Sequence, residues 1–235
     1  MLSHHSQLDR CLELARHGRY EDAADLAGVA VLDEPSDGQL WQLCGLLRHK
    51  LGRMPGALEA LETASALVPL APASRCALAE CYARSGHDGL ACEIYCALSR
   101  DRACPTDLLP NIASGLGSMG EDEEALNTCL ELLRRDPNYH QAHYGVAFYL
   151  RRMGRPPRAM LPMVARAHEI APEVALYRIT LACLHHDLGN GREAYDLLRD
   201  VDPSAYHCRC CVERAAKIFR NHGDDERAAA LEDLA

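Results

Sequence analysis

The chain has 235 residues, a formal net charge of −9 at pH 7 and a charged fraction of 25%. Such an acidic chain has no global attraction for nucleic acid or anionic membranes, and no apolar run approaches the ~20 residues that span a bilayer. Aromatic residues are only 5% of the chain, which favours closely packed helices over sheet. From the acidic charge we expect no nucleic-acid and no membrane partner. Because residues 1–5 do not begin the apolar core of a signal peptide, we also expect a cytoplasmic protein.

A glycine followed five residues later by alanine occurs seven times, and consecutive glycines are 34 or 35 residues apart. The glycines are Gly18, Gly52, Gly86, Gly120, Gly154, Gly189 and Gly223. A fixed period of this length is typical of repeat proteins, in which each unit is one supersecondary element. The residue seven positions before each glycine is also small: Cys11, Gly45, Ala79, Ala113, Ala147, Ala182 and Ala216. Small side chains on both sides of a crossing let two helices approach closely, so the pattern predicts seven helical hairpins.

Within each unit the first helix is expected to end at the glycine, where a left-handed backbone conformation costs least without a Cβ. The second helix then follows, and in four units a proline marks its end. These prolines are Pro35, Pro69, Pro137 and Pro172.

The fifth unit is expected to be the most irregular. Pro156 and Pro157 stand at the start of its second helix, where proline is tolerated, and Pro162 lies farther in, where it should bend or delay the helix. Arg166 occupies a position that is usually small. We place the one-residue insertion between Gly154 and Gly189 near residues 171–172.

The second unit carries the most complete set of signature residues: Trp41, Gly45, Gly52, Ala57, Leu61, Ala64 and Pro69. On these residues the chain resembles the tetratricopeptide-repeat family over about residues 4–235. The resemblance implies an all-α fold, an α-solenoid of antiparallel helix hairpins wound as a right-handed superhelix, forming a single domain over residues 1–235. Pentatricopeptide repeats have a similar hairpin and period but read RNA, and the acidic charge of this chain argues against them.

The resemblance also implies a non-catalytic protein–protein interaction scaffold or adaptor, in which first helices line a concave groove that holds a partner segment. We find no glycine-rich phosphate loop, nucleophile elbow or metalloprotease motif, and we expect no enzyme activity and no cofactor. A role as an accessory subunit or a chaperone of an enzyme or secretion system stays open as an alternative, because the fold does not determine the function.

By the same resemblance, groove residues lie 13, 10, 6, 3 and 2 positions before each turn glycine. In the fourth unit they are mostly small (Asp107, Pro110, Ser114, Gly117 and Ser118), and in the sixth they are Leu176, Ile179, Cys183, His186 and Asp187. Aromatic and arginine side chains often carry binding energy at interfaces. The residues that we expect to bind a partner segment with acidic and apolar side chains are Tyr144, Phe148, Arg151, Arg152, His186 and Arg220. The alternative is that the two aromatic residues pack between repeats and the arginines are solvated.

Two features near the end of the sequence leave further alternatives open. His207, Cys208, Cys210 and Cys211 are zinc-ligand types, so a zinc-binding or thiol-redox-responsive regulatory module is possible. A correctly spaced second pair of zinc ligands is not evident, so we expect thiols without a function and no metal at these residues. Either the small alanine face of the last helix is tolerated in water, or Leu231 and Leu234 contact another subunit or partner, with self-association through the C-terminal helix.

Overall fold

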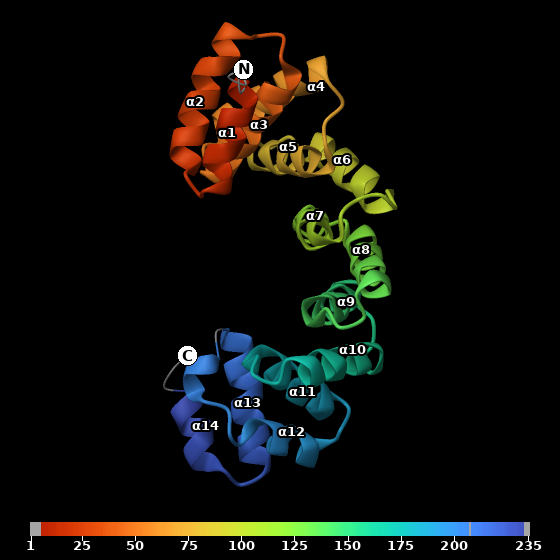
Figure 1. Cartoon of the computed structure of the whole chain (residues 1–235). Coiled ribbons are helices and arrows are strands. Elements are labelled where there is room, and N and C mark those ends of the chain that lie inside the picture. The colour runs from red at the N-terminus through yellow and green to blue at the C-terminus, as the bar shows by residue number, and fades with distance from the viewer. Residues whose placement is uncertain (1–5, 207, 233–235) are drawn as a thin grey trace. The chain divides into compact units, whose positions relative to one another are not determined.

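The computed structural model describes residues 6–206 and 208–232, and its regular structure there consists of helices alone (Figure 1). Contacts along the chain divide it into two units, residues 1–121 and 122–235, and each is described by itself. The expected all-α architecture of helical hairpins is confirmed. A single domain over the full chain stays a prediction.

Unit 1 contains three complete hairpins and the first helix of a fourth. Its helices are α1 (Gln7–Arg16), α2 (Tyr20–Asp33), α3 (Gly38–Lys50), α4 (Met54–Leu67), α5 (Pro72–Arg84), α6 (Asp88–Arg100), the short 3-10 helix η1 (Thr106–Leu108) and α7 (Leu109–Ser118). Helices pack in the pairs α1 with α2, α3 with α4 and α5 with α6. Each pair stacks on the next through α2 on α3, α4 on α5 and α6 on α7.

Unit 2 begins with one helix and continues with three hairpins, coloured green to blue in Figure 1. Its helices are α8 (Asp122–Arg135), α9 (His140–Arg152), α10 (Pro157–Ile170), α11 (Ala175–Asp187), α12 (Gly191–Leu198), the 3-10 helix η2 (Pro203–Ala205), α13 (Arg209–Asn221) and α14 (Asp225–Glu232). The pairs α9 with α10, α11 with α12 and α13 with α14 stack through α8 on α9, α10 on α11 and α12 on α13.

All seven turn glycines have a positive φ, between 68° and 86°, and no other described residue does. A Cβ at any of them would meet no atom within 4 Å, so the backbone conformation rather than crowding requires glycine. At the first turn the Arg19 N–H donates to the Leu14 carbonyl at 3.0 Å, as expected of a left-handed helix end. The glycine period therefore marks the hairpin turns.

The small residues lie at the helix crossings, as the pattern predicts. A Cβ at Gly45 would come within 2.6 Å of Leu61 Cγ, so the α3–α4 crossing leaves no space for a side chain. Six of the seven alanines that follow the turns are buried: Ala23, Ala57, Ala91, Ala125, Ala194 and Ala228. The exception is Ala159, which is exposed.

The fifth hairpin explains that exception and corrects the placement of the insertion. Every other second helix begins two residues after its turn glycine, whereas α10 begins three residues after Gly154, because Pro156 is extended (φ −67°, ψ 153°). The buried positions then move by one residue, to Met160, Val164 and Ala167. The extra residue thus lies in the turn at Pro156, not near residues 171–172. Arg166 is exposed because Ala167 takes the buried place, and α10 continues through Pro162.

Leu231 belongs to the core of the last hairpin. This side chain is buried and packs in one cluster with Phe219 and Ala228. Leu231 is therefore not available to a second subunit, and Leu234 lies outside the described residues. Self-association through the C-terminal helix stays a prediction, without a contribution from Leu231.

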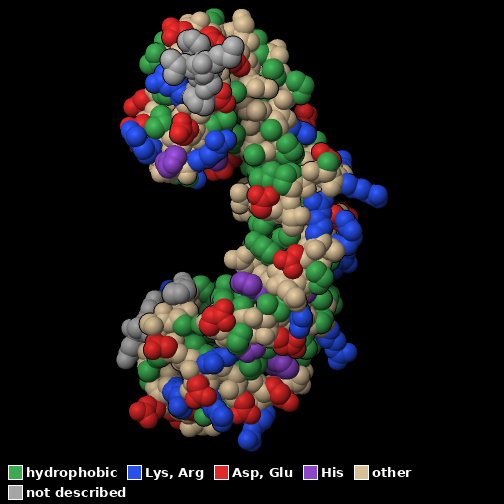
Figure 2. Space-filling model, in the orientation of Figure 1, with side chains coloured by type: hydrophobic (Ala, Val, Ile, Leu, Met, Phe, Trp, Pro, Cys, Tyr) green, Lys and Arg blue, Asp and Glu red, His purple; other side chains and the backbone are tan. Residues whose placement is uncertain are grey.

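The visible surface of each unit carries acidic and basic side chains interspersed with hydrophobic ones (Figure 2). None of the described helices combines the length and the apolar character that crossing a bilayer requires.

A candidate peptide-binding cavity in unit 2

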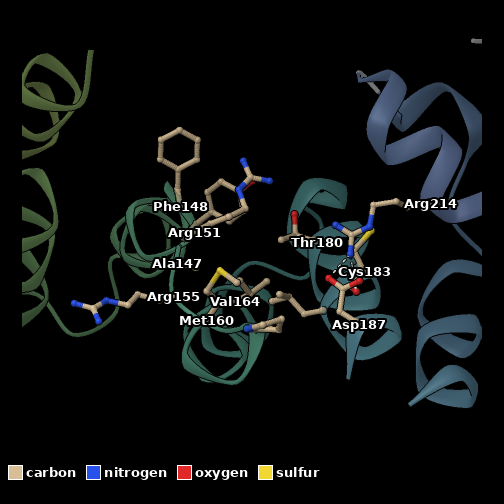
Figure 3. Close-up of a pocket in the computed structure, with 13 residues that line it drawn as sticks. Ala147, Phe148, Arg151, Arg155, Met160, Val164, Thr180, Cys183, Asp187 and Arg214 are labelled. Carbon is tan, nitrogen blue, oxygen red and sulfur yellow. Dashed lines mark hydrogen bonds and ion pairs between the residues drawn. The ribbon is translucent and has the colours of Figure 1, made fainter. Parts of the chain in front are cut away.

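A cavity of about 250 Å³ lies between α9, α10 and α11 and reaches one side chain of α13 (Figure 3). Its floor is apolar and includes Ala147, Met160, Val164 and Leu184. Tyr144 and Phe148 add aromatic surface, and the charged lining residues are Arg151, Arg155, Asp187 and Arg214. The cavity therefore joins apolar surface with an excess of positive charge.

Two features of the local fold place these side chains. Tyr144, Phe148 and Arg151 are four and three residues apart along α9, so they share one helix face. On α10 the extra residue in the turn places Met160 where other units have a buried alanine. The irregular turn thus contributes a flexible thioether to the cavity floor.

The arginines of the cavity differ in their partners. Arg214 pairs with the Asp187 carboxylate and donates to the Cys183 carbonyl at 3.0 Å, so its charge is compensated. The Arg151 guanidinium lies 5.7 Å from the centre of the Phe148 ring. Among the described residues no carboxylate pairs with Arg151 or Arg155. Figure 3 shows the Arg214–Asp187 pair on one side of the cavity and these two arginines on the other.

Of the six residues expected to bind a partner, the structure brings three together. Tyr144, Phe148 and Arg151 line the cavity, whereas Arg152, His186 and Arg220 do not. The Arg152 guanidinium lies 3.1 Å from the Asp122 carboxylate. Arg220 pairs with Glu232.

Tyr144 also packs between repeats. Its ring centre lies 5.2 Å from that of Tyr177, whose hydroxyl is 2.9 Å from His140 Nδ1. Burial raises the pKa of the Tyr177 hydroxyl above its ordinary value, so this hydroxyl stays protonated around neutral pH. Tyr144 is therefore held by the next hairpin while it lines the cavity.

The groove positions inferred from the sequence missed several lining residues. Cys183 and Asp187 are among the expected positions of the sixth unit, but Arg155, Met160, Val164, Thr180, Leu184 and Arg214 are not. Met160 and Val164 follow only once the inserted residue is assigned to the turn. Arg214 stands one residue after Glu213, the position expected from the offsets.

Unit 1 has a cavity of a different character, of about 330 Å³, between α5, α6 and α7. Its lining includes Asn111, Ser114 and Ser118, and two of these are small positions expected for the fourth unit. Glu80 lies 3.5 Å from Arg84 and 3.0 Å from His49 Nε2, so the charges near this cavity compensate one another.

Three thiols meet at the start of α13. Cys208 Sγ is 2.6 Å from Cys211 Sγ and 3.1 Å from Cys210 Sγ. The fourth residue of the expected cluster, His207, lies outside the described residues. Within them no further histidine, cysteine or carboxylate joins this group of potential metal ligands.

Comparison with known proteins identifies the fold. No protein-family model and no curated protein matches the chain. Among solved structures, the C-terminal part of a TPR repeat-containing protein from Cytophaga hutchinsonii has 13% identity over 95% of this chain and 92% of that chain, with a TM-score of 0.73. A tetratricopeptide repeat protein from Parabacteroides merdae has 16% identity over 95% and 88%, with a TM-score of 0.65.

A third structure is YrrB, described as a TPR protein with an unusual peptide-binding site. It has 16% identity to this chain, covers 88% of this chain and 100% of its own, and has a TM-score of 0.63. At such identities the likeness shows the fold alone. Together with the seven left-handed turn glycines and the small residues at the crossings, it shows that the chain has the tetratricopeptide-repeat fold.

Proposed function

We propose that the chain is a non-catalytic protein-interaction module that holds a segment of a partner protein in the cavity of unit 2. The observation that carries this proposal is an apolar floor beside two arginines, Arg151 and Arg155, that lack a carboxylate partner among the described residues. A partner segment with an apolar side chain and a nearby carboxylate is complementary to both features.

The apolar side chain of the partner enters between Met160, Val164 and Leu184 in this proposal. Full burial of a leucine- or phenylalanine-sized group is worth about 1.5–3 kcal/mol. The carboxylate pairs with Arg151, whose planar guanidinium can donate two parallel hydrogen bonds to it. Phe148 lies against the same guanidinium and limits its freedom. Aromatic and arginine side chains are the types that dominate interface energies.

The likeness to YrrB supports a peptide ligand only by analogy of fold, because that description belongs to YrrB. An accessory role for an enzyme or a secretion system uses the same cavity and differs only in the identity of the partner. What we propose is therefore the kind of segment that the cavity binds, one with an apolar side chain and a nearby carboxylate.

Partner capture tests this proposal. The intact chain, the variant Phe148→Ala/Arg151→Glu and the control Arg192→Glu are used to capture partners, which are identified by mass spectrometry. Arg192 is exposed on α12 of the same unit and does not line the cavity, so the control matches the charge change. We expect one set of partners to be lost with the double variant alone. Equal recovery by all three proteins would overturn the cavity assignment.

A further inference from the structure

The start of α13 holds two neighbouring thiols that do not line the cavity of unit 2. Cys208 is the N-cap residue of α13, and its sulfur accepts the Cys211 N–H at 3.3 Å. The Cys211 sulfur lies 2.6 Å away and the Cys210 sulfur 3.1 Å away. Two thiols three residues apart on one helical turn can be joined by a disulfide without a rearrangement of the helix.

Exposure separates these cysteines from most others in the chain. Cys208 and Cys210 are exposed and Cys211 is half-buried, whereas seven cysteines are buried. Burial raises the pKa of the Cys76 thiol to about 11 and that of the Cys129 thiol to about 12, so those groups stay protonated. Since the thiolate is the reactive form, these buried cysteines are inert by comparison.

The surroundings of Cys208 stabilise its thiolate. Partial burial opposes ionisation, but hydrogen bonds from the Cys211 and Cys210 thiols and from the Cys211 N–H outweigh it, and the positive charge of Arg151 on α9 adds to them. The pKa of Cys208 therefore lies below its ordinary value. At Cys211, burial and the neighbouring sulfurs of Cys208, Cys210 and Cys183 raise the pKa. The pair is thus asymmetric, because Cys208 loses its proton more readily than Cys211.

We propose that Cys208 and Cys211 form an oxidisable dithiol whose substrate is a hydroperoxide, a function that is separate from partner binding. The Cys208 thiolate attacks the terminal peroxide oxygen, the O–O bond breaks, and Cys208 becomes a sulfenic acid. The alkoxide or hydroxide that leaves takes up from solvent the proton that Cys208 had released, and becomes an alcohol or water. The Cys211 sulfur then attacks the Cys208 sulfur, and the hydroxyl leaves as water with the Cys211 proton. The two thiols together lose two electrons and two protons to the peroxide.

The sequence offers a direct assay for this disulfide. Trypsin cleaves after Arg209, which separates Cys208 from Cys210 and Cys211. The full-length reduced chain is treated with hydrogen peroxide, blocked with N-ethylmaleimide, digested and analysed by mass spectrometry. We expect peptides 200–209 and 210–214 to be joined with one maleimide on the remaining thiol, and, apart from that adduct, to be lighter by two hydrogens than their sum. Absence of the joined peptide in the oxidised wild-type chain would refute the proposal.

Serine variants assign the two roles. We expect Cys208→Ser to abolish the joined peptide, and Cys211→Ser to slow its formation at least about tenfold and leave a sulfenic acid on Cys208 that dimedone traps. Cys210→Ser should still form the joined peptide because Cys211 remains, and the control Cys92→Ser/Cys96→Ser should form it at the wild-type rate. Persistence of the joined peptide at that rate in Cys211→Ser would show Cys210 as the resolving thiol and overturn the assignment.

Alkylation of the unmutated chain provides a test that does not depend on the folding of a variant. The iodoacetamide reaction of Cys208 should reach half its maximal rate at a lower pH than that of Cys211, which fragment masses of the same two tryptic peptides report separately. Equal pH profiles for the two residues would contradict a stabilised thiolate at Cys208.

Discussion

The cavities of units 1 and 2 are built from the same kind of helical hairpin but have opposite chemical character. In unit 1 the lining includes Ser114 and Ser118, and Glu80 compensates Arg84. In unit 2 the floor is apolar, and Arg151 has no carboxylate partner among the described residues. The hairpin repeat therefore provides a hollow, while the side chains at a few positions decide whether the hollow attracts a partner.

The largest expected difference between the two cavities concerns a buried carboxylate. Val164 is completely buried in the floor of unit 2, so Val164→Asp should lower the free energy of unfolding by about 3 kcal/mol or more. Ser114 is exposed in unit 1, and Ser114→Asp should change it by about 0.5 kcal/mol or less. Urea denaturation followed by circular dichroism measures both. Similar losses for the two variants would show that the cavities do not differ as described.

Reversing the charge of one arginine in each cavity should affect partner binding differently. For a partner captured by the chain, Arg151→Glu should weaken the affinity about thirtyfold, or about 2 kcal/mol, because it replaces an attractive contact by a repulsive one. Arg84→Glu in unit 1 makes the same charge change and should leave the affinity within about twofold. Titration calorimetry with the purified partner gives both values, and a larger loss for Arg84→Glu would reverse the assignment.

Gly45 of unit 1 and Gly189 of unit 2 are required for different reasons, which a pair of alanine substitutions can distinguish. At Gly45 in unit 1 a Cβ collides with Leu61, so Gly45→Ala should cost about 2 kcal/mol through overpacking. At Gly189 in unit 2 the space is free but φ is 82°, so Gly189→Ala should cost about 1 kcal/mol through backbone strain. Adding Leu61→Ala should reduce the loss of stability in Gly45→Ala by removing the collision. It should not reduce the loss in Gly189→Ala.

The smallest effect concerns the surface of α8 in unit 2. Hydrogen bonds from Arg134 and then Arg135 lower the pKa of Glu131 from 4.5 to about 2. A carboxylate with a lowered pKa in the folded state adds stability above its ordinary pKa, and this contribution is lost as the pH falls from about 4.5 to about 2. Glu131→Gln should therefore flatten the loss of stability in this pH range slightly. Identical pH dependence of the two melting temperatures would contradict the pairing.

Much of the fold follows from the glycine period, because a left-handed turn and a close crossing each restrict the residue type. The place of the inserted residue does not follow from this period, since an extra residue anywhere between Gly154 and Gly189 gives the same spacing. Pro172 is the usual closing proline displaced by one residue, which is equally consistent with an insertion at either end of the helix. The extended conformation of Pro156 decides the matter.

The site was only partly predictable for a similar reason. Helical offsets place Tyr144, Phe148 and Arg151 on one face, and the structure shows all three at the cavity. Offsets say nothing of partners on other helices, so they could not show that Asp122 pairs with Arg152 or that Glu232 pairs with Arg220. An arginine on the right face is a candidate for binding only if no carboxylate of the fold already pairs with it.

Selected peptides show most directly whether the cavity of unit 2 binds an acidic and apolar segment. A random peptide library is selected against the full-length chain, and the affinity of each selected peptide is measured for the wild type, Phe148→Ala/Arg151→Glu and Arg84→Glu. We expect peptides that combine a carboxylate with a large apolar residue. The double variant should bind them about a hundredfold more weakly, and Arg84→Glu should bind them with the wild-type affinity. Selected peptides that bind all three proteins equally would contradict this expectation.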